Sequence, residues 1–597
     1  MPSTEIGADR GSAAERSNLP AHRPPLIGRD EQAAAVGQRL MEAEAGLLTL
    51  IGAGGCGKTC LAVDVAGRLL DAFPDGVWLV ELAALSDPAL VDQVVAAVLG
   101  VREGVGQSLR DALLGFLRPR RLLLLLDNCE HLVDACARLT DVLLGFCAEL
   151  RILATSREPL RTIREVTWRV PSLAAPDPQR VLRLDELAEY AAVHLFVTRA
   201  QAVRSSFELR SDNAAAVARV CAQLEGIPLA LELAAARTRA LAVEQIAARL
   251  EEDFGLLVGG NPTGPSRQRT LEATLDWSHD LLIETEQILF RRLSVFAGGF
   301  DLEAAEVVCG GDALVRADVL DALTRLVDKS LVVLEERSGD ARYRLLEAIR
   351  QYARNRLAAC GETATVLRRH AVHYQALAEQ AEMELWGREQ ALWLGRLERD
   401  HDNLRAALGW LLEGAEDAEA GRRFAVALSR FWHTRGNLSE GRALLRRALA
   451  TRVGEVTQGW VTALTWASSL AHHQGDLDEA EALGQQAVAA GRELGDPLFL
   501  GLALVTLGDE LVRPGDVDQA VGTLDEGVAI LRAAGDRAGP SLSIGLGILG
   551  TALRLRGDLD RAAAALEEGL ALSRLVGNSW AIGIALQDLC PGGARAR

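Results

Sequence analysis

The stretch GAGGCGKT, residues 52–59, decides the fold of the N-terminal part of this chain. It follows an apolar run, GLLTLI at 46–51, and precedes an amphipathic run, CLAVDVAGRLLDAF at 60–73. The first run is typical of a buried strand and the second of a helix. The stretch matches the pattern GxxxxGK[ST] completely, in the strand, loop and helix context that the pattern requires. We therefore predict a phosphate-binding loop here rather than an ordinary glycine-rich turn.

Such a loop predicts binding of a nucleoside triphosphate, here ATP with Mg²⁺. Its backbone N–H groups wrap the phosphates at the positive end of the following helix. Lys58 would contact the β and γ oxygens, and the Thr59 hydroxyl would bind Mg²⁺. The positions of this loop predicted to hold the nucleotide are Gly52, Gly54, Gly55, Gly57, Lys58, Thr59 and Cys60.

Lysine usage supports this assignment. Lys and Arg together number 64, yet only Lys58 and Lys329 are lysines. A chain that otherwise uses arginine keeps a lysine at the position where phosphate binding requires one. Lys329 has no comparable explanation from the sequence.

Five leucines at 122–126 are followed by Asp127 and Asn128. Such a run is typical of a strand buried on both faces, so its first polar residue emerges at the carboxyl edge of a parallel sheet, beside the phosphate loop. We assign Asp127 as a Mg²⁺ partner, in preference to a strand that simply ends in an Asx turn. Asn128 cannot take a proton from an attacking water, so hydrolysis should be slow. Glu130 could act as the base instead, although a solvated loop glutamate is the favoured interpretation.

A further polar strand end, ILATSR at 152–157, is predicted to reach the same edge of the sheet. Arg157 could contact the γ-phosphate there and report its presence, with a surface arginine as the alternative. Lys58, Asp127 and Arg157 are therefore the candidate catalytic groups. Thr59 and Asp127 are the candidate Mg²⁺ ligands.

Four similar segments recur in the last third of the chain: GNLSEG at 436–441, GDLDEA at 475–480, GDVDQA at 515–520 and GDLDRA at 557–562. Their glycines lie 39, 40 and 42 residues apart. Each segment ends one helical pattern and begins another, which predicts helix pairs stacked as a tetratricopeptide-like solenoid. A helical pattern at 578–589 starts a fifth pair whose second helix is missing, so we expect either a shortened chain or a partner over this end.

Composition narrows the function classes. A net charge of −18 with a pI near 5.2 argues against a general nucleic-acid coat. Nine scattered cysteines without a CxxC pair indicate neither a disulfide framework nor a zinc knuckle and favour a reduced cytoplasm. Two histidine pairs, at 370/373 and 472/473, lack the further ligands of a zinc site and are expected to be exposed helical residues. No run is long enough to span a membrane, so a soluble cytoplasmic protein is expected.

Five motifs in order resemble the STAND nucleotide-binding module of the NB-ARC type. They are LIGRD at 26–30, the phosphate loop, LDN at 126–128, TSR at 155–157 and GIPLA at 226–230. The resemblance covers residues 25–350 and, with the repeats, nearly the whole chain. The chain is similar to bacterial STAND regulators, many of which carry a LuxR-type DNA-binding domain after the repeats. No LuxR-like recognition helix is seen in this sequence.

The resemblance implies roles for further residues. Gly28 and Arg29 would lie near the adenine and ribose, and Pro228 would pack on the base from a helical lid. Arg157 would be the γ-phosphate sensor. In related proteins the winged helix ends in a Met-His-Asp motif whose histidine meets the ADP phosphate; here YRLLE at 343–347 falls at that place. Leu346 cannot make this contact, so the lid would have to close by packing alone.

We therefore predict an α/β nucleotide-binding domain with a parallel sheet, a helical lid, a winged helix and an all-α solenoid. The predicted boundaries are a disordered leader at 1–24, a P-loop NTPase domain at 25–175, a lid at 176–260, a winged helix at 261–350, a helical connector at 351–425 and repeats at 426–597. The winged helix is expected to pack on the lid rather than to read DNA.

The leading functional hypothesis is a signalling switch operated by ATP and ADP, at most a slow ATPase, with transcriptional regulation as its output. A protein or small-molecule inducer is expected at the repeats, together with nucleotide-dependent self-association and no membrane partner. Two alternatives stay open. One is a P-loop kinase of a small molecule, and the other is a repeat scaffold with a vestigial nucleotide site.

Overall fold

A computed structural model describes most of the chain. The described residues are 16–21, 25–42, 46–103, 107–177, 183–257, 266–311, 313–337, 340–387, 389–414, 418–450, 455–513, 516–576, 582 and 586. They form two compact units. The first comprises residues 1–101 and 113–369, and the second comprises 102–112 and 370–597. Residues 258–265, where the predicted lid meets the predicted winged helix, and nearly all of the helical pattern at 578–589 lie outside the described residues.

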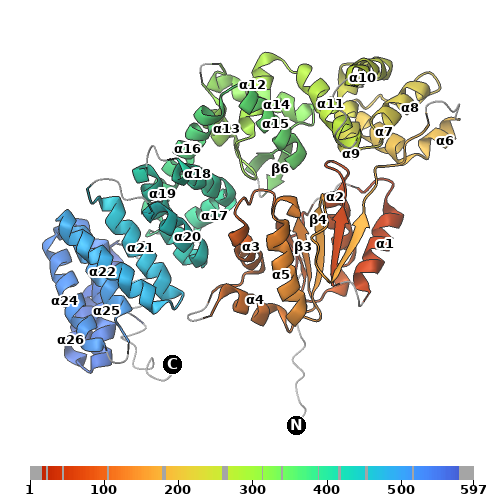
Figure 1. Cartoon of the computed structure of the whole chain (residues 1–597). Coiled ribbons are helices and arrows are strands. Elements are labelled where there is room, and N and C mark those ends of the chain that lie inside the picture. The colour runs from red at the N-terminus through yellow and green to blue at the C-terminus, as the bar shows by residue number, and fades with distance from the viewer. Residues whose placement is uncertain are drawn as a thin grey trace, which may run out of the picture. The chain divides into compact units, whose positions relative to one another are not determined.

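The first unit begins with a parallel sheet (Figure 1). Its five strands lie in the order β2-β3-β4-β1-β5. Its strands are β1 (Leu47–Ile51), β2 (Val77–Glu81), β3 (Leu123–Asp127), β4 (Arg151–Ser156) and β5 (Glu165–Arg169). The helices around it are α1 (Asp30–Met41), α2 (Lys58–Arg68), α3 (Val91–Leu99), α4 (Leu109–Leu117) and α5 (Val133–Phe146). Because β3 and β4 pair in parallel and β4 pairs with β1, their carboxyl ends meet at one edge.

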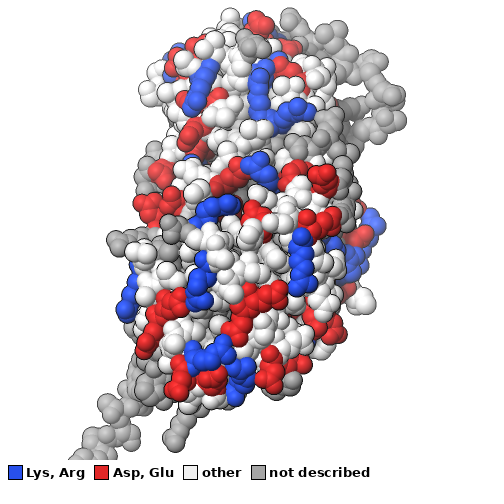
Figure 2. Space-filling model, turned by 90° about the vertical axis from the view of Figure 1, so that its left-hand side faces the viewer, with Lys and Arg blue, Asp and Glu red and all other residues white. Residues whose placement is uncertain are grey.

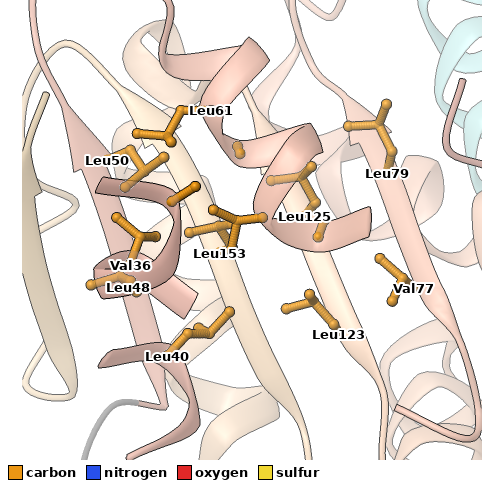
Figure 3. Packing of buried hydrophobic residues seen from close by; sticks show 14 of the residues in the cluster. Val36, Leu40, Leu48, Leu50, Leu61, Val77, Leu79, Leu123, Leu125 and Leu153 are labelled. Atoms are coloured by element: carbon orange, nitrogen blue, oxygen red, sulfur yellow. The ribbon is translucent and has the colours of Figure 1, made fainter. Parts of the chain in front are cut away.

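The sheet is held by an apolar layer between its strands and helices α1 and α2. Figure 3 shows Val36 and Leu40 of α1 and Leu61 of α2 packed over side chains of four strands, Leu125 and Leu153 among them. Every leucine of β3 is fully buried, as expected for a strand covered on both faces. The α/β prediction is confirmed, and the run of leucines places its first polar residue at the carboxyl edge.

Two segments differ from the sequence prediction. Residues 16–21, assigned to the disordered leader, lie along the edge of the sheet, where the Asn18 amide donates to Leu79 O and its Oδ1 accepts from Leu79 N. The rest of that leader, residues 1–15 and 22–24, lies outside the described residues. Strand β5 was not predicted, because EVTWR is only half buried at the sheet edge and lacks an apolar run.

The remainder of the first unit is mainly helical. A helical group contains α6 (Leu184–Ala188), α7 (Ala191–Val203), α8 (Ala214–Gln223), α9 (Pro228–Ala236) and α10 (Val243–Leu257). A winged helix follows with α11 (Ser266–Asp280), α12 (Glu284–Leu293), α13 (Leu302–Cys309), α14 (Val319–Asp328), the antiparallel β6 (Val333–Arg337) and β7 (Asp340–Arg344), and α15 (Glu347–Ala359). The chain passes on through α16 (Thr363–Glu384), which crosses the boundary between the units.

Lys329, the second lysine of the chain, forms an ion pair inside the winged helix. Lys329, at the end of α14, pairs with the carboxylate of Glu286, whose side chain is 1% exposed. Arg325 donates to the other oxygen of Glu286 at 2.9 Å. A nearly inaccessible carboxylate needs such cationic partners, so Lys329 stabilises the winged helix.

Acid should weaken the first unit through Glu362, which joins the start of α16 to α12. Hydrogen bonds from Arg292 and then Arg291 lower its pKa to about 2. A lowered pKa in the folded state means that the stabilisation is present above the ordinary pKa of 4.5 and is lost as pH falls toward 2.

We therefore expect Glu362→Gln to destabilise the protein by about 2–3 kcal/mol near neutral pH. This difference should shrink between pH 4.5 and 2. Thermal unfolding of both forms across that range measures it. A difference that does not change with pH would contradict the assignment.

The described part of the second unit is a stack of helix pairs. After α17 (Gln390–Arg399) and α18 (His401–Glu413) come the pairs α19 (Ala418–Arg435) with α20 (Leu438–Leu449), α21 (Gln458–His473) with α22 (Leu477–Leu494), α23 (Pro497–Glu510) with α24 (Val517–Ala533), and α25 (Gly539–Arg556) with α26 (Leu559–Val576). Within three of the turns Gly436, Gly475 and Gly557 have φ of 79°, 82° and 90°, which glycine adopts without strain. Gly515 lies outside the described residues. The predicted solenoid is confirmed.

Ion pairs tie neighbouring repeats together. Arg532 pairs with Glu568 at 3.0 Å and Arg561 with Asp525 at 2.8 Å, residues separated by about one repeat. On the face drawn in Figure 2, Lys and Arg side chains are interspersed with Asp and Glu.

The structure tests what the sequence predicts for the histidine pairs, for metal sites and for membrane-spanning helices. His370 is buried and lies 3.4 Å from Asn403 Oδ1, so it is a core histidine and not an exposed one as predicted. Within the described part of the chain, no three metal-binding side chains gather as a metal site requires. None of the helices in that same part has the length and apolar character for crossing a membrane.

Candidate nucleotide-binding site

The predicted phosphate loop joins β1 to α2 at the carboxyl edge of the sheet. Gly57 precedes α2 with φ of 88°, a conformation that side chains disfavour. A Cβ at Gly52 would lie 2.9 Å from Val170 O, so the loop also requires glycine at its first position. The Lys58 ammonium donates to Gly52 O at 3.0 Å and to Ala53 O at 3.1 Å. The Lys58 ammonium therefore lies against the backbone of the loop, at the N-terminus of α2.

Asp127 lies next to Thr59, as the sequence predicts for two ligands of one cation. The Thr59 hydroxyl donates to Asp127 Oδ1 at 2.8 Å, and the Thr155 hydroxyl donates to the same oxygen at 2.5 Å. The backbone N–H of Asn128 in turn donates to the Thr155 oxygen at 2.9 Å. Burial raises the pKa of Asp127, and the two hydroxyl donors offset only part of this shift.

These oxygens suit a hard divalent cation. A carboxylate and a hydroxyl are the protein ligands that Mg²⁺ takes beside nucleotide phosphates. A cation at this point would relieve the cost of burying Asp127, which is 5% exposed. No pattern in the sequence identifies the role of Thr155, which follows only from the pairing of β4 with β3.

Arg157 forms an ion pair with Glu130, a carboxylate whose role the sequence left open. Its Nε donates to Glu130 Oε1 at 3.0 Å, and its Nη2 would lie 4.0 Å from a Cβ at Gly54. The Glu130 side chain is only 17% exposed, so the interpretation as a solvated loop glutamate is wrong. The predicted sensor and the alternative base therefore form one ion pair beside the phosphate loop.

The residues that the resemblance assigned to the base and sugar surround the start of α2. Arg29 is 3% exposed, and one of its terminal nitrogens, Nη2, donates to Pro171 O at 2.8 Å. The other, Nη1, has no hydrogen-bond partner and would lie 3.3 Å from a Cβ at Gly57, with Pro228 Cγ at 3.8 Å from the same point. Burial lowers the pKa of Arg29. A buried donor directed at a phosphate loop is well placed to bind a nucleotide oxygen.

Gly28 and Cys60 complete the predicted set. Gly28 has φ of 67°, and a Cβ there would lie 2.3 Å from Ala191 Cβ at the start of α7, so this glycine brings α1 close to the helical group. Cys60 keeps an exposed surface on the first turn of α2. Desolvation by surrounding protein, followed by the charge of Glu232, raises the pKa of its thiol.

Apolar side chains from three helices cover the loop. Leu229 of α9 approaches Gly55 most closely, and its N–H donates to Gly55 O at 3.3 Å. Leu271 of α11 lies beside both Gly54 and Gly55. Ala348, two residues beyond Leu346, would lie 4.0 Å from a Cβ at Gly54. The winged helix therefore meets the loop through apolar packing.

Family comparison agrees with this arrangement. The model of the NB-ARC domain matches residues 29–168, and that of a winged helix-turn-helix domain matches residues 282–358. An uncharacterized protein of Mycobacterium tuberculosis is 40% identical over 353 residues, which cover 59% of this chain and 86% of that protein. This chain belongs to the NB-ARC-type STAND proteins. The match implies nucleotide binding by the NB-ARC domain.

Other relatives of this STAND protein are regulators. A putative HTH-type transcriptional regulator of Mycobacterium tuberculosis is 43% identical over 481 residues, covering 79% of this chain and 52% of the regulator. The regulatory protein AfsR of Streptomyces griseus is 31% identical over 365 residues, covering 58% of this chain and 33% of AfsR. The STAND chain thus spans about half the length, or less, of the regulators it matches.

A solved structure has the same fold. It is a STAND protein with a tetratricopeptide repeat sensor from Pyrococcus horikoshii, with a TM-score of 0.50 and 15% identity. The likeness covers 94% of this chain and 79% of that one. It supports the order of an NB-ARC domain, a winged helix and a repeat array in this STAND protein.

Proposed function

We propose that this protein is a nucleotide-operated switch in transcriptional regulation, held closed with ADP and opened when ATP replaces it. The observation that carries the proposal is the apolar cover of Gly54 and Gly55 by three helices, which sits over an assembled pair of Mg²⁺ ligands. A nucleotide in such a site contacts both the sheet domain and the helices above it. Its phosphates can therefore decide where those helices lie.

In the proposed complex, Lys58 binds the β and γ oxygens, and Thr59 and Asp127 hold Mg²⁺. Bound Mg²⁺ neutralises phosphate charge. Arg29 supplies its unpaired Nη1 to a nucleotide oxygen, and Pro228 closes the pocket from α9. Arg157 exchanges Glu130 for the γ-phosphate when a triphosphate enters.

Hydrolysis in this site is proposed to be slow. Asn128 stands where a carboxylate would activate water, and its backbone is held by Thr155 in a left-handed conformation. Nucleotide exchange, more than turnover, would then set the state of the switch.

The output is proposed from the relatives, whose names include transcriptional regulators. An inducer that binds the repeats would favour the open state, which self-associates or binds a partner. Moving such an equilibrium from 1:99 to 99:1 requires about 5.5 kcal/mol of differential binding, so nucleotide and inducer must both contribute.

The test begins with the nucleotide retained through purification. We expect ADP, released on denaturation, and a change of mass or hydrodynamic radius when a non-hydrolysable ATP analogue replaces it. Light scattering in both states measures this change. An identical mass and radius in both states would refute the switch, and steady phosphorylation of a small molecule would favour the kinase alternative.

A further inference from the structure

One arginine fastens the winged helix to the sheet domain. Arg350, in the first turn of α15, is 6% exposed. Its Nη2 donates to Ala83 O, in the loop after β2, at 3.0 Å, and its Nε donates to Glu347 Oε2 at 2.9 Å. Its Nη1 lies 3.5 Å from Phe296 O of the winged helix. One buried guanidinium therefore spans two domains that are far apart in the sequence.

The same turn of α15 lies over the phosphate loop. Ala348, Leu271 and the sensor Arg157 would each lie 3.9–4.0 Å from a Cβ at Gly54. Arg157, which is expected to contact the γ-phosphate, therefore lies beside the same glycine as the apolar side chains that cover the loop. A γ-phosphate bound against Ala348 and Leu271 would lose water without gaining donors from them. A nucleoside diphosphate has no γ-phosphate, so its binding avoids this cost.

We propose that Arg350 is the latch that makes the closed site select a diphosphate over a triphosphate. It does so by holding Ala348 against Gly54. This inference rests on the proposed nucleotide switch and names the residue that sets its resting state.

Opening of the site must break the contact that Arg350 makes with the sheet domain. Moving α15 away from Gly54 removes the Arg350 bond to Ala83 O, which is the contact of this guanidinium with the sheet domain. Hydrogen bonds from charged donors are stronger than neutral ones, and a buried charged group left without its acceptor is costly. A triphosphate must therefore overcome this bond, whereas a diphosphate leaves it in place.

Arg354 provides a matched control on the same helix. It lies one turn after Arg350, and its Nε donates to Ser294 O at 3.3 Å, inside the winged helix. Arg354→Ala removes an arginine and a hydrogen bond without touching the Ala83 contact. A purely structural contribution of α15 would respond to both substitutions.

The decisive experiment uses the full chain and a fluorescent ADP analogue. In Arg350→Ala we expect release of this analogue to accelerate about tenfold. The preference for ADP over a non-hydrolysable ATP analogue should fall by about the same factor. Arg354→Ala should keep both values of the wild type. An unchanged preference in Arg350→Ala, or equal changes in both variants, would overturn the latch.

Thermal unfolding would reveal whether Arg350→Ala fails to fold. In that case a second variant tests the proposal. Ala348→Glu places a carboxylate at Gly54 but leaves Arg350 and the winged-helix core intact. We expect weaker ADP binding, faster release and less preference for ADP, because the closed state then repels phosphate. An unchanged preference would overturn the proposal. Absence of all nucleotide binding in the wild type would instead refute the proposed function.

Discussion

Lys58→Ala should weaken ADP binding by about a hundredfold or more. The Lys58 ammonium lies at the mouth of the loop, 3.0 Å from Gly52 O, and is the lysine placed to meet phosphate oxygens. Removing a charged hydrogen-bond donor from a buried anion costs about 3 kcal/mol, which corresponds to this factor. Titration calorimetry with ADP and Mg²⁺ measures the effect.

Lys329→Ala is the control, because Lys329 is the other lysine in the sequence. It pairs with Glu286 in the winged helix, so its loss should lower the unfolding temperature and leave the affinity for ADP unchanged. Tight ADP binding in Lys58→Ala would mean that the loop does not hold the phosphates. Equal losses of affinity in the two variants would point to a general loss of folding.

Asp127→Asn should stabilise the protein without nucleotide and remove its response to Mg²⁺. Burial raises the pKa of Asp127, which means that the ionised carboxylate is unfavourable in the folded protein. A neutral amide can still accept from Thr59 and Thr155. We expect a gain of about 1 kcal/mol in the free energy of unfolding without ligand.

With ADP and Mg²⁺ the order of stabilities should reverse. The wild type gains by mass action from a cation held by Asp127 and Thr59, whereas Asp127→Asn offers the cation no charge. Thermal unfolding with and without Mg²⁺, at constant ADP, measures both effects. Asp134→Asn, on the exposed first turn of α5, should show neither. A Mg²⁺ response retained in Asp127→Asn would exclude this carboxylate as a ligand.

Much of the architecture follows from patterns that are local in the sequence. The glycine loop between an apolar strand and a helix predicts its own geometry, because the left-handed backbone at Gly57 needs glycine. The leucines of β3 place Asp127 at the sheet edge for the same kind of reason. Strand β5 escaped prediction because a half-buried edge strand carries no such pattern.

The site required more than motifs. Asp127 and Arg157 could be placed beside the phosphate loop because parallel strands end at one edge. Thr155 as the second donor to Asp127, and Glu130 as the partner of Arg157, could not be assigned. Which acceptor a side chain selects depends on rotamers and on neighbours from other strands, neither of which a linear spacing records.

The sequence by itself determined the phosphate loop, the run of leucines before Asp127 and the period of the repeats, because each depends on neighbours within one or two elements. Tertiary structure alone decided that Arg350 binds Ala83 O across 267 residues, and that Ala348 lies beside Gly54. Such contacts depend on how separate domains pack, and apolar packing has no residue code of its own.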